Sequence, residues 1–199
     1  MTLLDFAAPA GALGGLGTVM GKYVQELKAV NILEMLGSRL GRGGRGVAFN
    51  VMGDLNFAIK LGTERDIGRQ VQMLQAFGSR LKAAGIEQLR AATAMRGTDK
   101  NGRAFALLEK VEGEVLGETG FANLKHTEEL ADLMTDFFSR SGSEVGRMLG
   151  DNLRPAISYS LKTGRGFFGL SGDVVRSTDK AGKNIYTVID PSGSNILGQ

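Results

Sequence analysis

Residues 41–60, GRGGRGVAFNVMGDLNFAIK, limit the possible folds of this chain more than any other stretch. Four glycines stand within the first six positions, at 41, 43, 44 and 46. Without side chains, the backbone N–H groups of such a segment can closely approach another group, usually a phosphate. The β-prone residues VAFNV follow the glycines, and a second apolar run, NFAI, ends at Lys60. The pattern predicts a glycine-rich hairpin, with the lysine on the strand that follows it.

Two familiar glycine motifs fit this stretch less well. A P-loop ends in Lys-Ser or Lys-Thr at the start of a helix, and no such pair closes this loop. Gly41, Gly43 and Gly46 match the G-x-G-x-x-G spacing of a dinucleotide-binding loop, but that loop lies between a strand and a helix. A third interpretation is a glycine-rich hairpin, with a strand on both sides, that folds over a nucleotide so that its backbone N–H groups reach the phosphates. The alternative is a glycine-rich surface hairpin with a solvated lysine.

Composition excludes several other kinds of site. The chain has 199 residues, enough for one domain or for two small lobes that share a cleft. It has no cysteine, which excludes disulfides, thiol catalysis and cysteine zinc sites, and a single histidine, His126, which argues against a Ser-His-Asp triad. Scattered basic residues, a net charge of +3 and 7% aromatic residues argue against nucleic-acid binding. No apolar run reaches the roughly 18 residues of a membrane span.

Apolar spacing predicts an α+β fold. Helices are expected over residues 21–36, 62–85 and 126–142. Two hairpins are also expected: strands 89–97 and 104–113 joined by the turn TDKNGR, and strands 173–178 and 184–190 joined by the turn DKAGK. Residues 1–20 are expected to form a linker or flexible N-terminus, and residues 21–199 a single domain.

The chain resembles the protein-kinase-like superfamily at the motifs quoted above. The glycine loop lies between strands, and NFAIK is similar to the kinase V-A-I-K. The resemblance implies that Lys60 contacts the ATP phosphates and that Ala58 lies in the ATP-binding site. QVQMLQAF is similar to the kinase helix C, but Gln70 stands where the family has a glutamate. A glutamine can accept a hydrogen bond from Lys60 without contributing a charge.

The same resemblance implies a hinge and two lobes. AFALLEKVEGEVL is similar to the segment between kinase lobes, and implies that Glu109 to Val111 offer backbone groups to adenine. The implied fold is a reduced two-lobed one, with a β-rich N-lobe at about 21–110 and a small, mainly helical C-lobe at about 111–199.

Two aspartates match the acidic positions of the family. IYTVIDPSG places Asp190 at the end of an aliphatic strand, where the resemblance implies a magnesium ligand, although Pro-Ser-Gly replaces the expected Phe-Gly. LSGDVV resembles the H-G-D of small-molecule and atypical kinases, with Ser171 in the histidine position and Asp173 as the catalytic aspartate. The asparagine expected for a second magnesium is not evident, and Ser177 or Thr178 lies roughly at its position.

A rival assignment uses GDNLRPA, which resembles R-D-L-K-P with one residue inserted. Asp151 is then the base, Arg154 contacts phosphate and Asp173 holds the metal. A third possibility is that these aspartates only cap turns.

The resemblance implies an ATP- and Mg²⁺-dependent phosphotransferase that modifies a hydroxyl on a protein. Nine residues follow Asp190 (199 minus 190), as in the small kinases that bacteria deliver as effectors or toxins, so the expected place of action is the cytoplasm, after secretion or translocation. The alternatives are an inactive, pseudokinase-like nucleotide-binding or interaction module and a small-molecule kinase. The acceptor, the oligomeric state and the delivery route stay open.

Overall fold

The computed structural model describes residues 13–43, 46–116, 124–163 and 173–191. The chain divides into two compact units, one made of Met1–Val71 with Thr93–Lys110 and the other of Gln72–Ala92 with Val111–Gln199. Helix α2 (Glu64–Ala84) continues from the first unit into the second.

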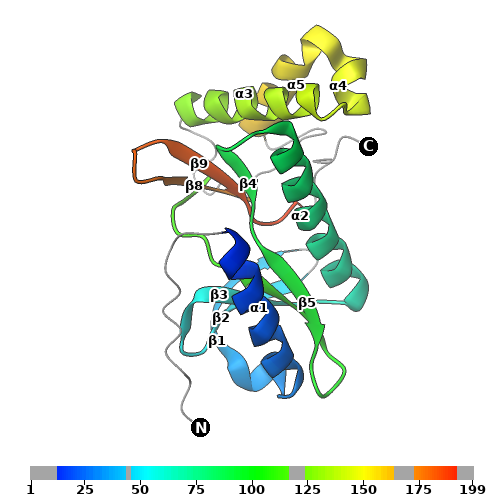
Figure 1. Ribbon diagram of the computed structural model, residues 1–199, viewed down its shortest axis with the longest axis vertical. Helices are drawn as coiled ribbons and strands as arrows, with labels where there is room; N and C mark the ends of the chain where they lie inside the picture. The colour runs from blue at the N-terminus through cyan, green and yellow to red at the C-terminus, as the bar shows by residue number, and fades with distance from the viewer. Residues whose placement is uncertain (1–12, 44–45, 117–123, 164–172, 192–199) are drawn as a thin grey trace. The chain divides into compact units, whose positions relative to one another are not determined.

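The first unit contains a five-stranded antiparallel sheet in the order β1-β2-β3-β6-β5 (Figure 1). Its strands are β1 (Leu36–Gly43), β2 (Gly46–Val51), β3 (Asp54–Leu61), β5 (Ala94–Thr98) and β6 (Ala104–Glu109). In chain order, the sheet is built from a glycine-rich hairpin, then the strand that carries Lys60 and, after helix α2, two further strands. This is the arrangement that the kinase resemblance implies for the N-lobe.

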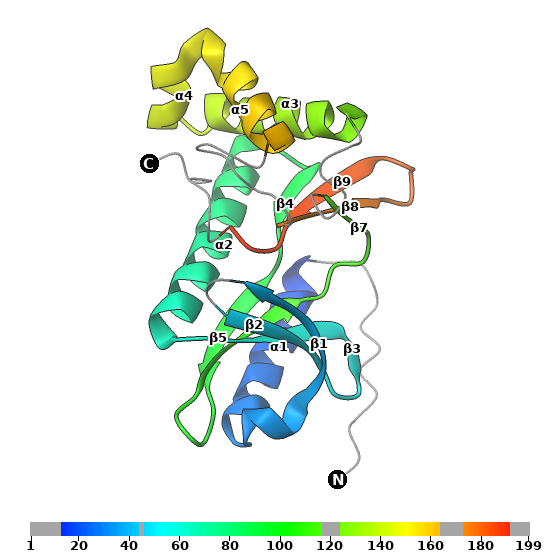
Figure 2. The same cartoon turned by 180° about the vertical axis from the view of Figure 1, so that it is seen from behind.

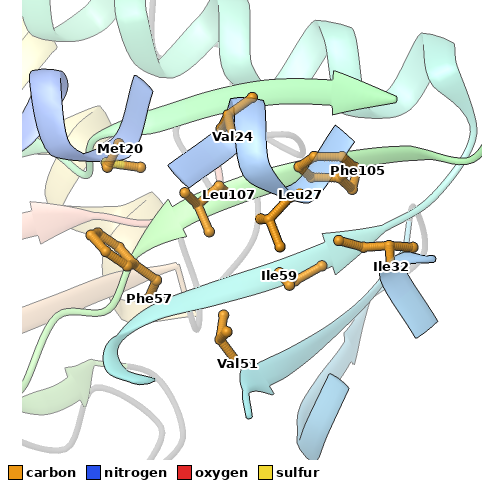
Figure 3. Packing of buried hydrophobic residues seen from close by; sticks show 9 residues of the cluster. All are labelled: Met20, Val24, Leu27, Ile32, Val51, Phe57, Ile59, Phe105 and Leu107. Carbon is orange, nitrogen blue, oxygen red and sulfur yellow. The ribbon is translucent and has the colours of Figure 1, made fainter. Parts of the chain in front are cut away.

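Helix α1 (Leu13–Lys28) covers one face of this sheet. Its side chains Met20, Val24 and Leu27 belong to one buried hydrophobic cluster with Ile59 and Leu107 of the sheet, and these five residues are at most 4% exposed (Figure 3). The helix begins at Leu13, so the boundary expected at residue 20 between a linker and the domain falls inside it.

The helix predicted over 21–36 is wrong in its second half. After α1 the chain forms a single 3-10 turn, η1 (Ile32–Met35), and then enters β1. The side chain of Asn31 caps this turn by accepting a hydrogen bond from the Leu33 N–H, and Leu36 pairs with Val51 of β2. Local capping and strand pairing thus override a helical apolar pattern.

The second unit contains a four-stranded sheet in the order β4-β9-β8-β7, with helices α3 (Leu124–Arg140), α4 (Glu144–Leu149) and α5 (Leu153–Thr163) and the short 3-10 turn η2 (Gly150–Asn152) (Figures 1 and 2). Its strands are β4 (Leu89–Ala91), β7 (Glu114–Leu116), β8 (Val174–Thr178) and β9 (Asn184–Val188). The rings of Phe77 on α2 and Phe137 on α3 meet edge to face, with centroids 5.0 Å apart. The predicted α+β fold is confirmed by these helices and sheets.

The strand predicted over 89–97 is two strands that belong to different sheets. The Ala92 N–H donates to the carbonyl of Val188 in the second sheet, whereas the Thr93 carbonyl accepts from the Glu109 N–H in the first. The change of sheet falls between two adjacent residues, and a continuous β-prone sequence carries no signal for it.

Nearly identical turns close the β5–β6 and β8–β9 hairpins. One carboxylate oxygen of Asp99 accepts from the N–H groups of Asn101 and Arg103, and Asp179 does the same for Ala181 and Lys183. The turns differ in burial, because the second oxygen of Asp99 also accepts from the Ile32 N–H, which ties η1 to this hairpin.

In the described part of the chain, no helix is long and apolar enough to cross a bilayer.

Candidate nucleotide site

The structure brings Lys60 together with the glycine-rich hairpin. Strands β1 and β2 pair as far as Gly43 and Gly46, while residues 44–45 lie outside the described part of the chain. Gly46 has a φ of +156°, and a Cβ there would lie 2.4 Å from the Leu61 carbonyl oxygen and 3.2 Å from Lys60 Cε. The lysine side chain therefore runs alongside the backbone of Gly46, in space that any other residue would fill.

Lys60 lies between small residues in its row of the sheet. It pairs with Ala48 on β2 and with Ala106 on β6. Ala48 pairs in turn with Gly41 on β1, and Ala106 pairs with Arg96 on β5. Directly paired residues share a face of an antiparallel sheet, and successive residues alternate between faces. Since Ile59 belongs to the core beneath α1, Lys60 and this row lie on the opposite face.

Burial around Lys60 argues against the alternative of a solvated lysine. Lys60 is 5% exposed, and Ala58, two residues earlier on the same face of β3, is 6% exposed. Ala58 pairs with Asn50 and Leu108. A charged lysine in a row of small residues must be neutralised or hydrogen-bonded, because an isolated buried charge is costly.

Gln70 lies on the buried side of α2. Gln70 is 2% exposed, and its apolar neighbours Ile67 and Val71 are 1% and 4% exposed. Only two residues separate the end of β3 from the start of α2. The contact between Gln70 and Lys60 that the kinase resemblance implies stays a prediction. Both are buried polar residues of the first unit.

The predicted hinge begins at the end of β6. The Glu109 N–H donates to the Thr93 carbonyl at 2.8 Å, and the Lys110 N–H donates to the Asn56 carbonyl at 2.8 Å. The Glu109 carboxylate also accepts a hydrogen bond from the Thr93 N–H at 3.0 Å. Two of the three predicted hinge N–H groups are therefore used within the first unit, and an adenine contact at this position depends on Val111 and on carbonyl oxygens.

In the second unit the structure brings Asp173 and Asp190 to the same end of the β8–β9 hairpin. Asp173 directly precedes β8, and Asp190 follows β9 by one residue. The Ile189 N–H donates to the Asp173 carbonyl at 2.8 Å, next to the last rung of the hairpin, Val174 with Val188. Both aspartates are half-buried. A strand, a turn and a strand separate them, as the sequence predicts.

Ser177 and Thr178 lie too far from Asp173 and Asp190 to bind the same metal ion. They pair with Ile185 and Asn184 at the turn end of the hairpin. With a rise of about 3.3 Å per residue, they lie more than about 10 Å from the end that carries Asp173. The expectation that one of them stands near the position of the second magnesium ligand is wrong, because β8 begins immediately after Asp173.

The rival aspartate, Asp151, lies in a different setting. It is exposed, belongs to η2, and is followed by helix α5. The guanidinium of Arg154 donates to Asp132 at 2.6 Å and to Glu128 at 2.9 Å, both on α3. The hydrogen bond and charge of Asp132 raise the pKa of Arg154. A phosphate contact by this arginine would have to compete with two carboxylates. Ser171, the residue in the histidine position, lies outside the described residues.

The described residues contain no group of three or more His, Cys, Asp or Glu side chains that could hold a metal ion. Mg²⁺ commonly takes only one or two protein carboxylates and completes its shell with water and substrate phosphates.

One polar cluster in the second unit was not found from the sequence. A carboxylate oxygen of Glu129 on α3 accepts hydrogen bonds from the Tyr186 hydroxyl at 2.5 Å and from the Asn184 side-chain amide at 2.6 Å, both on β9. His126 Nδ1 lies 3.5 Å from the same oxygen. The partners are 55 and 57 residues apart in sequence, and a Glu, an Asn and a Tyr so far apart carry no pattern.

Comparisons with known proteins give likenesses of fold only. No family model matches the chain, and no curated protein matches it. An aminoglycoside phosphotransferase solved with GDP and kanamycin is 15% identical at a TM-score of 0.47, over 93% of this chain and 74% of that one. The kinase domain of PknI from Mycobacterium tuberculosis is 12% identical at a TM-score of 0.41, over 79% of this chain and 58% of that domain. A Cydia pomonella granulovirus kinase is 9% identical at a TM-score of 0.34, over 62% of this chain and 44% of that one.

Proposed function

We propose that this protein is an ATP- and Mg²⁺-dependent phosphotransferase. The observation that carries the proposal is the placement of Lys60 against the backbone of Gly46, beneath a glycine-rich hairpin. A buried ammonium group beside closely approachable backbone N–H groups is suited to the phosphates of a nucleotide. In this proposal the glycines allow close approach to the phosphates, and Lys60 belongs to the same site.

In this proposal the first unit binds the nucleotide. Backbone N–H groups of the β1–β2 hairpin, between Gly41 and Gly46, and the Lys60 ammonium contact the phosphates. The small side chain of Ala58 leaves room for the base. The N–H of Val111, the first residue after the first unit ends at Lys110, is the proposed hinge contact. Gln70 orients Lys60 as a hydrogen-bond acceptor without adding charge.

The two aspartates of the second unit then supply the chemistry. Asp190 is the proposed ligand of the Mg²⁺ that accompanies ATP, and Asp173 is the proposed acceptor of a hydrogen bond from the substrate hydroxyl. The γ-phosphoryl group passes to the hydroxyl oxygen, giving a phosphate ester and ADP, and the hydroxyl proton leaves toward Asp173. Catalysis of this kind depends mainly on positioning and electrostatic stabilisation.

The proposed acceptor is a hydroxyl on a protein, and a small-molecule hydroxyl is the alternative. A pseudokinase-like nucleotide-binding module is the second candidate function. The observation that favours it is the uncharged Gln70, which is buried where the resemblance implies a glutamate.

The proposal includes a cytoplasmic place of action. Delivery as an effector or toxin is tested by expressing the chain in a host cell and asking whether K60M relieves any growth defect.

The deciding experiment is a thermal-shift titration with ATP alone and with ATP plus Mg²⁺. The wild-type protein is expected to be stabilised by ATP and further stabilised when Mg²⁺ is added, and a pseudokinase by ATP alone. Lys60→Met should remove both responses, because a methionine of similar length fills the space without a charge. Lys100→Met, in the exposed β5–β6 turn, is the matched control and should respond as the wild type does. A wild-type protein that responds to neither component, or a K60M protein that responds fully, would refute the proposal.

A further inference from the structure

Helix α3 presents two adjacent glutamates to two different neighbours in the second unit. Glu128 contacts α5, where it accepts hydrogen bonds from Arg154 and from the Ser158 hydroxyl and forms an ion pair with Lys162. Glu129 instead contacts β9 through Tyr186 and Asn184. The two side chains have the same chemistry and comparable numbers of partners. They differ in which element they hold.

The Tyr186–Glu129 contact is made from a fully buried side chain. Tyr186 is 0% exposed, pairs with Arg176 on β8 and with Leu89 on β4, and donates its backbone N–H to the Gln88 carbonyl. Its hydroxyl reaches out of the sheet to Glu129 on α3. A buried hydroxyl bonded to a carboxylate is among the stronger hydrogen bonds in proteins.

Both partners show the electrostatic effect of this contact. The Tyr186 hydrogen bond, assisted by the Asn184 amide, lowers the pKa of Glu129. Burial and, next, the Glu129 hydrogen bond raise the pKa of Tyr186. The contact therefore joins a carboxylate and a neutral phenol over the ordinary pH range.

The contact also continues across the sheet. The side-chain oxygen of Asn184 accepts from the guanidinium of Arg176 at 3.1 Å, and Arg176 donates to Glu114 on β7 at 2.8 and 3.0 Å. Four elements, α3, β9, β8 and β7, are thus joined by one chain of polar contacts. The strand that it fixes to α3 is the strand that leads to Asp190, four residues beyond Tyr186.

We infer that Glu129 is a positioning residue for Asp173 and Asp190: by holding Tyr186 and Asn184 against α3, it fixes the β8–β9 hairpin whose open end carries both aspartates. The inference deepens the proposed function and rests on it for the roles of the two aspartates. The mechanical link, α3 to the hairpin end, does not rest on it. The Ile189 N–H, which donates to the Asp173 carbonyl, reports directly on the order of that end.

Hydrogen exchange of the full chain tests the mechanical link. Tyr186→Phe removes only the hydroxyl and keeps the buried ring, and Glu129→Gln keeps an acceptor without the charge. Exchange at the Ile189 amide is expected to become about tenfold faster in Y186F and several-fold faster in E129Q. Glu128→Gln is the matched control: exchange should increase in α5, with Ile189 unchanged. Wild-type exchange at Ile189 in folded Y186F, or an equal increase in E128Q, would overturn the inference.

ATP binding with EDTA and with Mg²⁺ tests what the link does for the site. Y186F is expected to bind ATP in EDTA as tightly as the wild type, since the glycine hairpin and Lys60 are untouched, and to lose at least threefold of the gain in affinity that Mg²⁺ provides. A uniform loss in both conditions indicates general destabilisation and overturns the positioning role. Wild-type protein that binds no ATP in either condition refutes the proposed function, and with it the roles of the aspartates, while the exchange data still decide the link between α3 and the hairpin.

Discussion

Two glycines of the same hairpin are expected to respond in opposite ways to the same substitution. Gly46→Ala places a methyl group 2.4 Å from the Leu61 carbonyl oxygen and 3.2 Å from Lys60 Cε, at a φ of +156°. Gly41→Ala places it where no heavy atom lies within 4 Å, on the neighbouring strand β1. The two variants have the same composition, so their difference reports the local geometry alone.

The magnitude follows from two costs at Gly46. A side chain in a sparsely populated backbone region costs about 1–3 kcal/mol. Overpacking against backbone that must shift costs about 1–3 kcal/mol more. G46A should therefore lower the free energy of unfolding by roughly 2–6 kcal/mol. G41A should change it by less than about 1 kcal/mol, because removing a glycine from an unstrained position mainly reduces the entropy of the unfolded chain.

Urea unfolding followed by circular dichroism measures the difference. With a denaturant slope of about 2 kcal/mol per molar, G46A should lower the urea midpoint by roughly 1–3 M, while G41A leaves it nearly unchanged. ATP binding, measured well below the midpoint, should be weaker in G46A because the added methyl group displaces Lys60. Equal midpoints for the two variants would refute the geometry described for the hairpin, and unchanged ATP affinity in G46A would separate Lys60 from the site.

Three further outcomes test other parts of the structure. Asp190→Ala should lose Mg²⁺-dependent ATP binding, and Asp173→Ala should bind Mg²⁺–ATP without phosphoryl transfer. Asp151→Ala should stay active. An active D190A beside an inactive D151A would establish the rival assignment. Gln70→Glu should leave ATP binding equal or tighter if this buried side chain faces the strand lysine, and a severe loss would show that it does not. Lys162 and then Ser158 lower the pKa of Glu128 to about 2, so its contribution is present above about pH 4.5 and is lost as the pH falls toward 2; the difference in melting temperature between wild type and E128Q should vanish over that range, and a constant difference would contradict the assignment.

The glycine hairpin and its lysine could be predicted from sequence because their geometry is local. Glycine density, β-prone residues and a period of two are properties of short segments, and they set Lys60 on the face opposite Ile59 whatever surrounds the sheet. The same holds for the two TDK-x-G turns, where an aspartate oxygen accepts N–H groups two and four residues further along the chain. Such contacts form within a few residues, so the sequence alone specifies them.

The tertiary structure decided everything that depends on partners distant in sequence. Ala92 is bonded to one sheet and Thr93 to the other. Ser177 lies at the turn end of the β8–β9 hairpin, at the opposite end from Asp173 and Asp190. It also joined Glu129 to Tyr186, 57 residues away. Pairing energies between distant segments depend on which groups are buried together, and no local pattern encodes that choice. The hairpin and the lysine were therefore readable in the sequence, whereas the contact that holds the two aspartates in place was not.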